Sequence, residues 1–114
     1  MLKTTYRYET KSRDRLLCIY LHGEIDHHSA YFLREELDGL LMRERPARLV
    51  LDLRGIEFMD SAGLGLLMGR YRLMRDLGGV MVIAEPNARV MKMLRLCGME
   101  RFFEIITGPK GERI

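Results

Sequence analysis

The chain has 114 residues, of which 47% are hydrophobic and 31% are charged, a composition typical of one globular domain with a single core. This composition excludes a disordered or fibrous chain. The formal net charge of +3 comes from basic residues that are spread along the sequence, so direct binding to nucleic acid is not expected.

The sequence carries no recognisable targeting or metal-binding pattern. Residues 1–12 lack the apolar segment of a signal peptide, and no apolar run suits a bilayer span, so a cytoplasmic protein without a membrane partner is expected. Cys18 and Cys97 lie outside any CxxC or Cys/His spacing, and His27 and His28 are adjacent without a third ligand. We therefore predict no metal, no cofactor and two reduced cysteines in the core.

The hydrophobic pattern predicts strands and helices that alternate after an initial hairpin. Alternating and β-branched runs are typical of strands, whereas apolar residues three or four apart are typical of amphipathic helices. The predicted strands are residues 3–8, 15–22, 49–53, 80–84 and 101–106. The predicted helices run from about Asp26 to Arg45, from about Ser61 to Gly78 and from about Pro86 to Gly98.

This order of elements indicates the α/β class. A helix between two strands is typical of a crossover that joins parallel strands, whereas the polar turn after residue 8 joins an antiparallel pair. The strand at 49–53 is apolar almost throughout, which is typical of a central strand covered on both faces. We expect one domain at residues 1–107 and a polar tail at 108–114.

The stretch FMDSAGLG, residues 58–65, places an acid and a hydroxyl between an apolar strand and a helix. A hydrolase nucleophile in a Gly-x-Ser-x-Gly elbow would need glycine where Met59 stands, and no pattern assigns a histidine base to Ser61. The glycines that follow are not spaced as in the dinucleotide fingerprint, and no Gly-Lys-Ser/Thr follows them. Enzyme activity is therefore not expected.

Two interpretations of Asp60 and Ser61 remain open. Either residue can be the N-cap of the helix, where a side-chain oxygen accepts a hydrogen bond from an amide one turn on. A serine at this position can also be phosphorylated, which would add about −1.5 to −2 charges beside Asp60. Gly65 and Gly69 each disfavour the helix by about 1 kcal/mol relative to Ala, which predicts that something approaches this helix closely.

The same helix has apolar residues on two sides. One side is expected to face the sheet and comprises Leu64, Leu67, Met68, Tyr71 and Met74. The other side comprises Leu66, Leu73 and Leu77, beside Arg70. This second set is either buried within the domain or forms an exposed patch that docks another protein. A solvated helix face is the expected place of the arginines Arg70, Arg72 and Arg75.

Three stretches together resemble one protein family: GEIDHHSA at 23–30, FMDSAGLGLLMGRY at 58–71 and GGVMVIAEPNARVMKMLRLCGM at 78–99. They are similar to the anti-anti-sigma factors with the STAS fold, over about residues 3–107. The D-S-x-G-L-G element is the most specific part, and D-H-H after the second strand favours the sporulation sigma-F branch over the general-stress branch. The resemblance implies a mixed sheet of four to five strands with helices mainly on one face.

The resemblance also implies a function. The unphosphorylated antagonist binds an anti-sigma factor, which releases the sigma factor that it held. The anti-sigma factor is also a serine kinase that inactivates the antagonist, and a serine phosphatase reverses the mark. By position Ser61 would be the phosphate acceptor, followed by Ala62 where family members often carry a second serine. The implied partner-binding residues are Asp26, Asp60, Gly63, Leu64, Gly65, Leu66, Gly69, Arg70 and Leu73.

Two alternatives to this function stay open from the sequence. A STAS module could bind a nucleotide or another small ligand at the N-terminus of the helix that begins at Ser61, because free amides there favour anions. The chain could also act in a general-stress rather than a sporulation sigma pathway.

Overall fold

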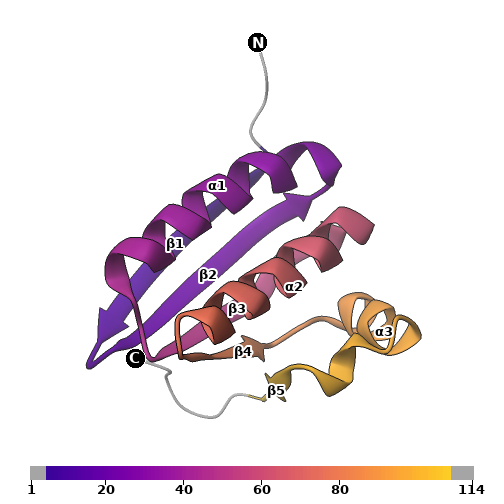
Figure 1. The fold of residues 1–114 in the computed structure, drawn as a ribbon. Coiled ribbons are helices and arrows are strands. Elements are labelled where there is room, and N and C mark those ends of the chain that lie inside the picture. The colour runs from indigo at the N-terminus through magenta and orange to yellow at the C-terminus, as the bar shows by residue number, and fades with distance from the viewer. Residues whose placement is uncertain (1–4, 109–114) are drawn as a thin grey trace.

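Five strands form one sheet in the order β1-β2-β3-β4-β5 in the computed structural model, which describes residues 5–108 (Figure 1). β1 and β2 are antiparallel, and all later neighbours are parallel, which confirms the predicted mixed sheet. The strands are β1 Tyr6–Arg13, β2 Leu16–Ile25, β3 Arg48–Met59, β4 Val80–Ala84 and β5 Glu104–Ile106. The helices are α1 His27–Glu44, α2 Ser61–Asp76, α3 Ala88–Leu96 and the short 3-10 helix η1 Met99–Arg101.

The first hairpin is longer than the sequence predicts. Polar residues after position 8 continue β1, because on this edge strand they lie exposed to solvent, so their polarity does not mark a turn. The turn consists of Asp14 and Arg15 alone, whose φ angles of 52° and 66° are those that a two-residue hairpin turn needs. Residues 3 and 4 of the predicted strand lie outside the described residues.

The helices share one core with one face of the sheet. α1 and α2 lie side by side over the central strands, and α3 lies at the β4 and β5 end (Figure 1). Leu51 of β3, Leu37 of α1 and Leu67 of α2 are each 0% exposed within this core. A small second cluster on the opposite face of the sheet consists of Cys18, Val50, Val82 and Ala84. The segment 49–53 of β3 is therefore buried throughout, as predicted.

The C-terminal elements differ from the prediction in length. α3 begins after the N-cap Asn87, whose side-chain oxygen accepts a hydrogen bond from the Val90 amide at 2.8 Å. Gly98, with a φ of 69°, then leads into η1, so β5 is shorter than predicted. Cys97 is exposed and its prediction as a core residue is wrong, because it follows the last turn of α3, whereas Cys18 is buried as predicted. Of the predicted tail, 109–114 lie outside the described residues.

Candidate functional site

Two helices start side by side at the carboxyl ends of β2 and β3. Ile25 and Met59, the last residues of these strands, are partners in the parallel register. The backbone N–H of Asp60 donates to the carbonyl oxygen of Ile25 at 3.1 Å. Because the two strands are parallel neighbours, α1 and α2 both begin at the same edge of the sheet (Figure 1).

Asp26 caps the first of these helices. Its Oδ1 accepts hydrogen bonds from the backbone amides of His28 at 3.0 Å and Ser29 at 2.9 Å. The Ser29 hydroxyl in turn accepts from the Asp26 amide at 3.0 Å, which completes a capping box. The backbone hydrogen bond from Ser29 is the main cause that lowers the pKa of Asp26, so this carboxylate is charged at neutral pH.

Asp60 caps the second helix and also contacts the first. Its Oδ1 accepts from the Ala62 amide at 2.8 Å, and its Oδ2 accepts from the His27 amide at 3.2 Å. Of the two candidate N-caps in the sequence, the structure therefore selects Asp60 and makes Ser61 the first residue of α2. Both carboxylate oxygens of Asp60 are engaged by backbone amides.

Ser61 is left exposed at this helix start. Within residues 5–108 its hydroxyl has no hydrogen-bond partner, so no histidine is hydrogen-bonded to it as a base. The side chain therefore has no structural role in the cap and lacks the arrangement of an activated nucleophile. The residue is accessible from solvent.

Packing within the domain explains only one of the three glycines that follow Ser61 in α2. Gly63 is buried, and a Cβ at this position would overlap the side chain of Met59 at the end of β3. By contrast, a Cβ at Gly65 or Gly69 would meet no atom within 4 Å. Close approach by the chain itself therefore explains Gly63 and leaves Gly65 and Gly69 unexplained.

The second apolar side of α2 is turned toward α1. Leu66 and Arg70 are 4% and 5% exposed, so the prediction that Arg70 lies on a solvated face is wrong. A helix that packs on a sheet beside a second helix buries the face toward the sheet and also the side toward that helix. The sequence of α2 alone does not show that α1 lies next to it. Arg72 and Arg75 are exposed, as predicted.

Arg70 forms an ion pair between the two helices. Its Nε lies 2.9 Å from Oδ1 of Asp38 in α1, without the alignment of a hydrogen bond, and its Nη1 is buried without a hydrogen-bond partner. Burial lowers the pKa of the Arg70 guanidinium, Asp38 opposes this effect and Arg34 adds to it. The guanidinium nevertheless stays charged.

The residues predicted to bind a partner thus fall into two groups. Gly63, Leu64, Leu66 and Arg70 are buried, so they present little surface to a partner. Residues that retain exposed surface are Asp26, Asp60, Gly65, Gly69 and Leu73. They extend from the two helix starts along one flank of α2.

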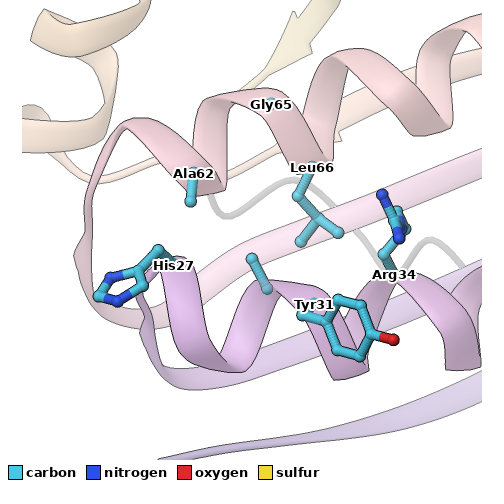
Figure 2. A pocket seen from close by; sticks show the side chains of 7 residues that line it. His27, Tyr31, Arg34, Ala62, Gly65 and Leu66 are labelled. Atoms are coloured by element: carbon cyan, nitrogen blue, oxygen red, sulfur yellow. The ribbon is translucent and has the colours of Figure 1, made fainter.

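A groove of about 360 Å³ lies between α1 and α2 and reaches Ala62, the residue that follows Ser61 (Figure 2). It is lined by His27, Ala30, Tyr31, Arg34, Ala62, Gly65 and Leu66. Sequence reasoning missed the contribution of α1. The sequence does contain a signal for this contribution, namely the helical spacing of residues 27, 30, 31 and 34. Residues three or four apart share one helix face.

The described part of the chain contains neither a candidate metal site nor a candidate membrane-spanning helix. Among residues 5–108 there is no group of three or more His, Cys, Asp or Glu side chains placed to hold a metal ion. None of the helices in this range has the length and apolar character needed to cross a bilayer.

Comparison with known proteins identifies the class of this domain. The sequence model of the STAS domain matches residues 7–110. The fold is similar to two solved structures of an anti-sigma factor antagonist, SpoIIAA. The unphosphorylated form has a TM-score of 0.77 and 23% identity, covering 91% of this chain and 90% of that one. The phosphorylated Bacillus form has a TM-score of 0.71 and 22% identity, covering 91% and 93%.

Sequence relatives show which group of STAS-domain proteins the chain belongs to. An anti-sigma F factor antagonist of Paenibacillus polymyxa is 36% identical over 90 residues, which are 79% of this chain and 77% of that protein. An anti-sigma-B factor antagonist of Bacillus subtilis strain 168 is 28% identical over 103 residues, 90% and 93% of the two chains. The chain belongs to the STAS-domain anti-sigma factor antagonists. This membership confirms the prediction of a regulator rather than an enzyme.

Proposed function

We propose that this chain is a cytoplasmic switch that frees a sigma factor. In its unphosphorylated form it binds an anti-sigma factor that is also a serine kinase. Phosphorylation of Ser61 ends this binding, and a serine phosphatase restores it. The observation that carries the proposal is the exposed hydroxyl of Ser61, which has no hydrogen-bond partner among residues 5–108 at the start of α2. A phosphorylated form is known for a structural relative, SpoIIAA.

The charges around Ser61 predict that phosphorylation weakens binding to the partner. Phosphorylation would add about −1.5 to −2 charges next to Asp60, whose carboxylate already accepts the amides of Ala62 and His27. A dianion placed in a docked interface without a basic partner costs several kcal/mol, because its hydration is lost and not replaced. We therefore expect phosphorylation to weaken binding about a hundredfold or more.

The test combines mass and affinity. The chain is incubated with Mg-ATP and the anti-sigma F factor of P. polymyxa, whose antagonist is 36% identical to this chain. Intact mass is expected to rise by one phosphoryl group in wild type and in Ser12→Ala, a control at another exposed serine, but not in Ser61→Ala. Ser61→Ala should keep the affinity of wild type and Ser61→Asp should lose it. Equal affinities of these two variants would contradict the proposal.

The pathway branch can be tested in the same assay. Identity is 36% to the anti-sigma F factor antagonist of P. polymyxa and 28% to the anti-sigma-B factor antagonist of B. subtilis. We propose the sporulation sigma-F branch and expect tighter binding to the P. polymyxa anti-sigma F factor than to the B. subtilis anti-sigma-B factor. The reverse order would place the chain in the general-stress branch.

The N-terminus of α2 offers little to a nucleotide or another anionic ligand. The amide of Ala62 is occupied by Asp60, and the amide of Gly63 donates to the Asp60 carbonyl at 2.9 Å. The Asp60 carboxylate would also repel a phosphate group. We expect no thermal shift with ATP or GTP, whereas a ligand at 100 times its dissociation constant would stabilise the domain by about 2.7 kcal/mol.

A further inference from the structure

The groove between α1 and α2 carries one cation without an anionic partner. Its lining includes no carboxylate, and Arg34 is exposed. The Arg34 guanidinium lies over the ring of Tyr31, at 5.6 Å from the centroid, and no carboxylate within residues 5–108 forms an ion pair with it. Asp38, one turn further along α1, is paired with Arg70 at 2.9 Å. Because this carboxylate is paired with Arg70 and no ion pair to Arg34 is found among residues 5–108, charge complementarity favours an anion from a partner at Arg34.

Apart from His27, Arg34 and the hydroxyl of Tyr31, the groove is lined by apolar groups. Leu66 points from α2 toward α1, with Tyr31 and Arg34 on the α1 side (Figure 2). Tyr31 of this lining is 56% exposed, and Phe32, which is next to it in α1 but does not line the groove, is 47% exposed; their ring centroids lie 5.2 Å apart in an edge-to-face arrangement. Exposed aromatic side chains of this kind are enriched in the centres of protein interfaces. Gly65 leaves the α2 side open, since nothing within 4 Å would contact a Cβ there.

We propose that this groove receives a segment of the anti-sigma factor that carries a carboxylate next to an apolar side chain. The carboxylate pairs with Arg34, and the apolar side chain lies over Leu66 and Gly65 against the Tyr31 ring. This inference rests on the proposed function and adds α1 to the binding surface. It also sharpens the switch, because a phosphate on Ser61 would repel an acidic segment that enters the neighbouring groove.

The first test fills the groove at Gly65. Gly65→Leu places a side chain in the open space, whereas Gly65→Ala adds only a methyl group and improves helix propensity. With the anti-sigma F factor of P. polymyxa as the probe, Gly65→Leu is expected to weaken binding about tenfold or more. Gly65→Ala fills less of the same space and should weaken binding less than Gly65→Leu does. Thermal melts of both variants check that the fold is retained.

The second test reverses the charge at the groove. Arg34→Glu is expected to weaken binding about 30-fold and to reduce its salt dependence, because attraction becomes repulsion. Arg72→Glu is the matched control, since Arg72 is exposed on α2, makes no ion pair within residues 5–108 and does not line the groove. It should change affinity less than about threefold.

The outcomes separate this proposal from the function on which it rests. If wild type binds, Ser61→Asp does not, and both Arg34→Glu and Gly65→Leu bind like wild type, the groove proposal is overturned and the phosphorylation switch stands. If wild type itself does not bind, both fall. Loss of binding in Arg34→Glu and Gly65→Leu, with retention in Arg72→Glu, supports the groove.

Discussion

The carboxylate of Asp60 binds the backbone of His27: Oδ2 accepts the His27 N–H at 3.2 Å. The same side chain caps α2 through the Ala62 amide at 2.8 Å. One residue therefore holds the first turn of α1 against the first turn of α2. Because both of its oxygens are in use, its main contribution is to position the helix starts around Ser61.

Asp60→Asn should separate these two roles. An asparagine oxygen can still accept the Ala62 amide, but its NH2 group cannot accept from His27. We expect a loss of about 0.5–1.5 kcal/mol in the free energy of unfolding. In amide hydrogen exchange, His27 should lose protection while Ala62 keeps it. Unchanged protection at His27 would show that the contact is not formed in solution.

The Asp38–Arg70 pair should matter more for stability than the exposed pairs. Asp38→Asn leaves the buried Arg70 guanidinium without its counter-ion, and we expect a loss of about 1–3 kcal/mol, since Asp38 itself is partly exposed. Glu100→Gln, which breaks an exposed pair with Arg95 at 3.8 Å, is the control and should change stability by less than about 0.5 kcal/mol. Urea unfolding measures both; equal effects would contradict the ion pair's role.

Two glycines of α2 should respond in opposite directions to alanine. Gly63→Ala pushes a methyl group into Met59 and should destabilise the domain by about 1–3 kcal/mol. Gly65→Ala meets no neighbour and should stabilise it by about 0.5–1 kcal/mol. Thermal unfolding of the two variants compares them directly. A stabilising Gly63→Ala would mean that Met59 can move aside freely.

Asp26 should contribute to the acid sensitivity of the domain. Its pKa is lowered in the folded state, chiefly by the backbone hydrogen bond from Ser29. The stability that it provides is therefore present above its unfolded pKa of about 3.9 and is lost as the pH falls through the folded value. Asp26→Asn keeps a capping oxygen but does not titrate, so it should lose less stability than wild type between about pH 5 and about pH 2.5. Equal losses in urea unfolding would exclude this contribution.

Much of the fold follows from local sequence signals. The leucines of α1 recur three or four residues apart, and Pro46, Gly78 and Gly98 lie just beyond helix ends, so the order and type of the elements could be predicted. Ser61 could be placed at a helix start because FMDSAGLG joins a β-like run to a helical one. The N-cap residue of α2 could not be predicted, since Asp and Ser both cap helices well.

The features of the site that could not be predicted depend on contacts between residues that are distant in the sequence. Arg70 occurs among other arginines on its helix, and only the position of α1 shows that it is buried against Asp38. Tyr31 and Arg34 are indistinguishable from an ordinary exposed face until α2 is placed beside them. The link from Asp60 to His27 joins residues 33 apart in the chain, and no local pattern marks it.

The parallel start of α1 and α2 also brings two helix dipoles together. Each helix carries about half a positive charge at its N-terminus, and Asp26 and Asp60 each place a carboxylate there. A phosphate on the first residue of α2 would be repelled by Asp60, but the positive ends of the two dipoles would offset part of this repulsion in the isolated domain. If Ser61 is phosphorylated as proposed, the modified protein can therefore remain folded, and the phosphate changes its behaviour only when a partner binds.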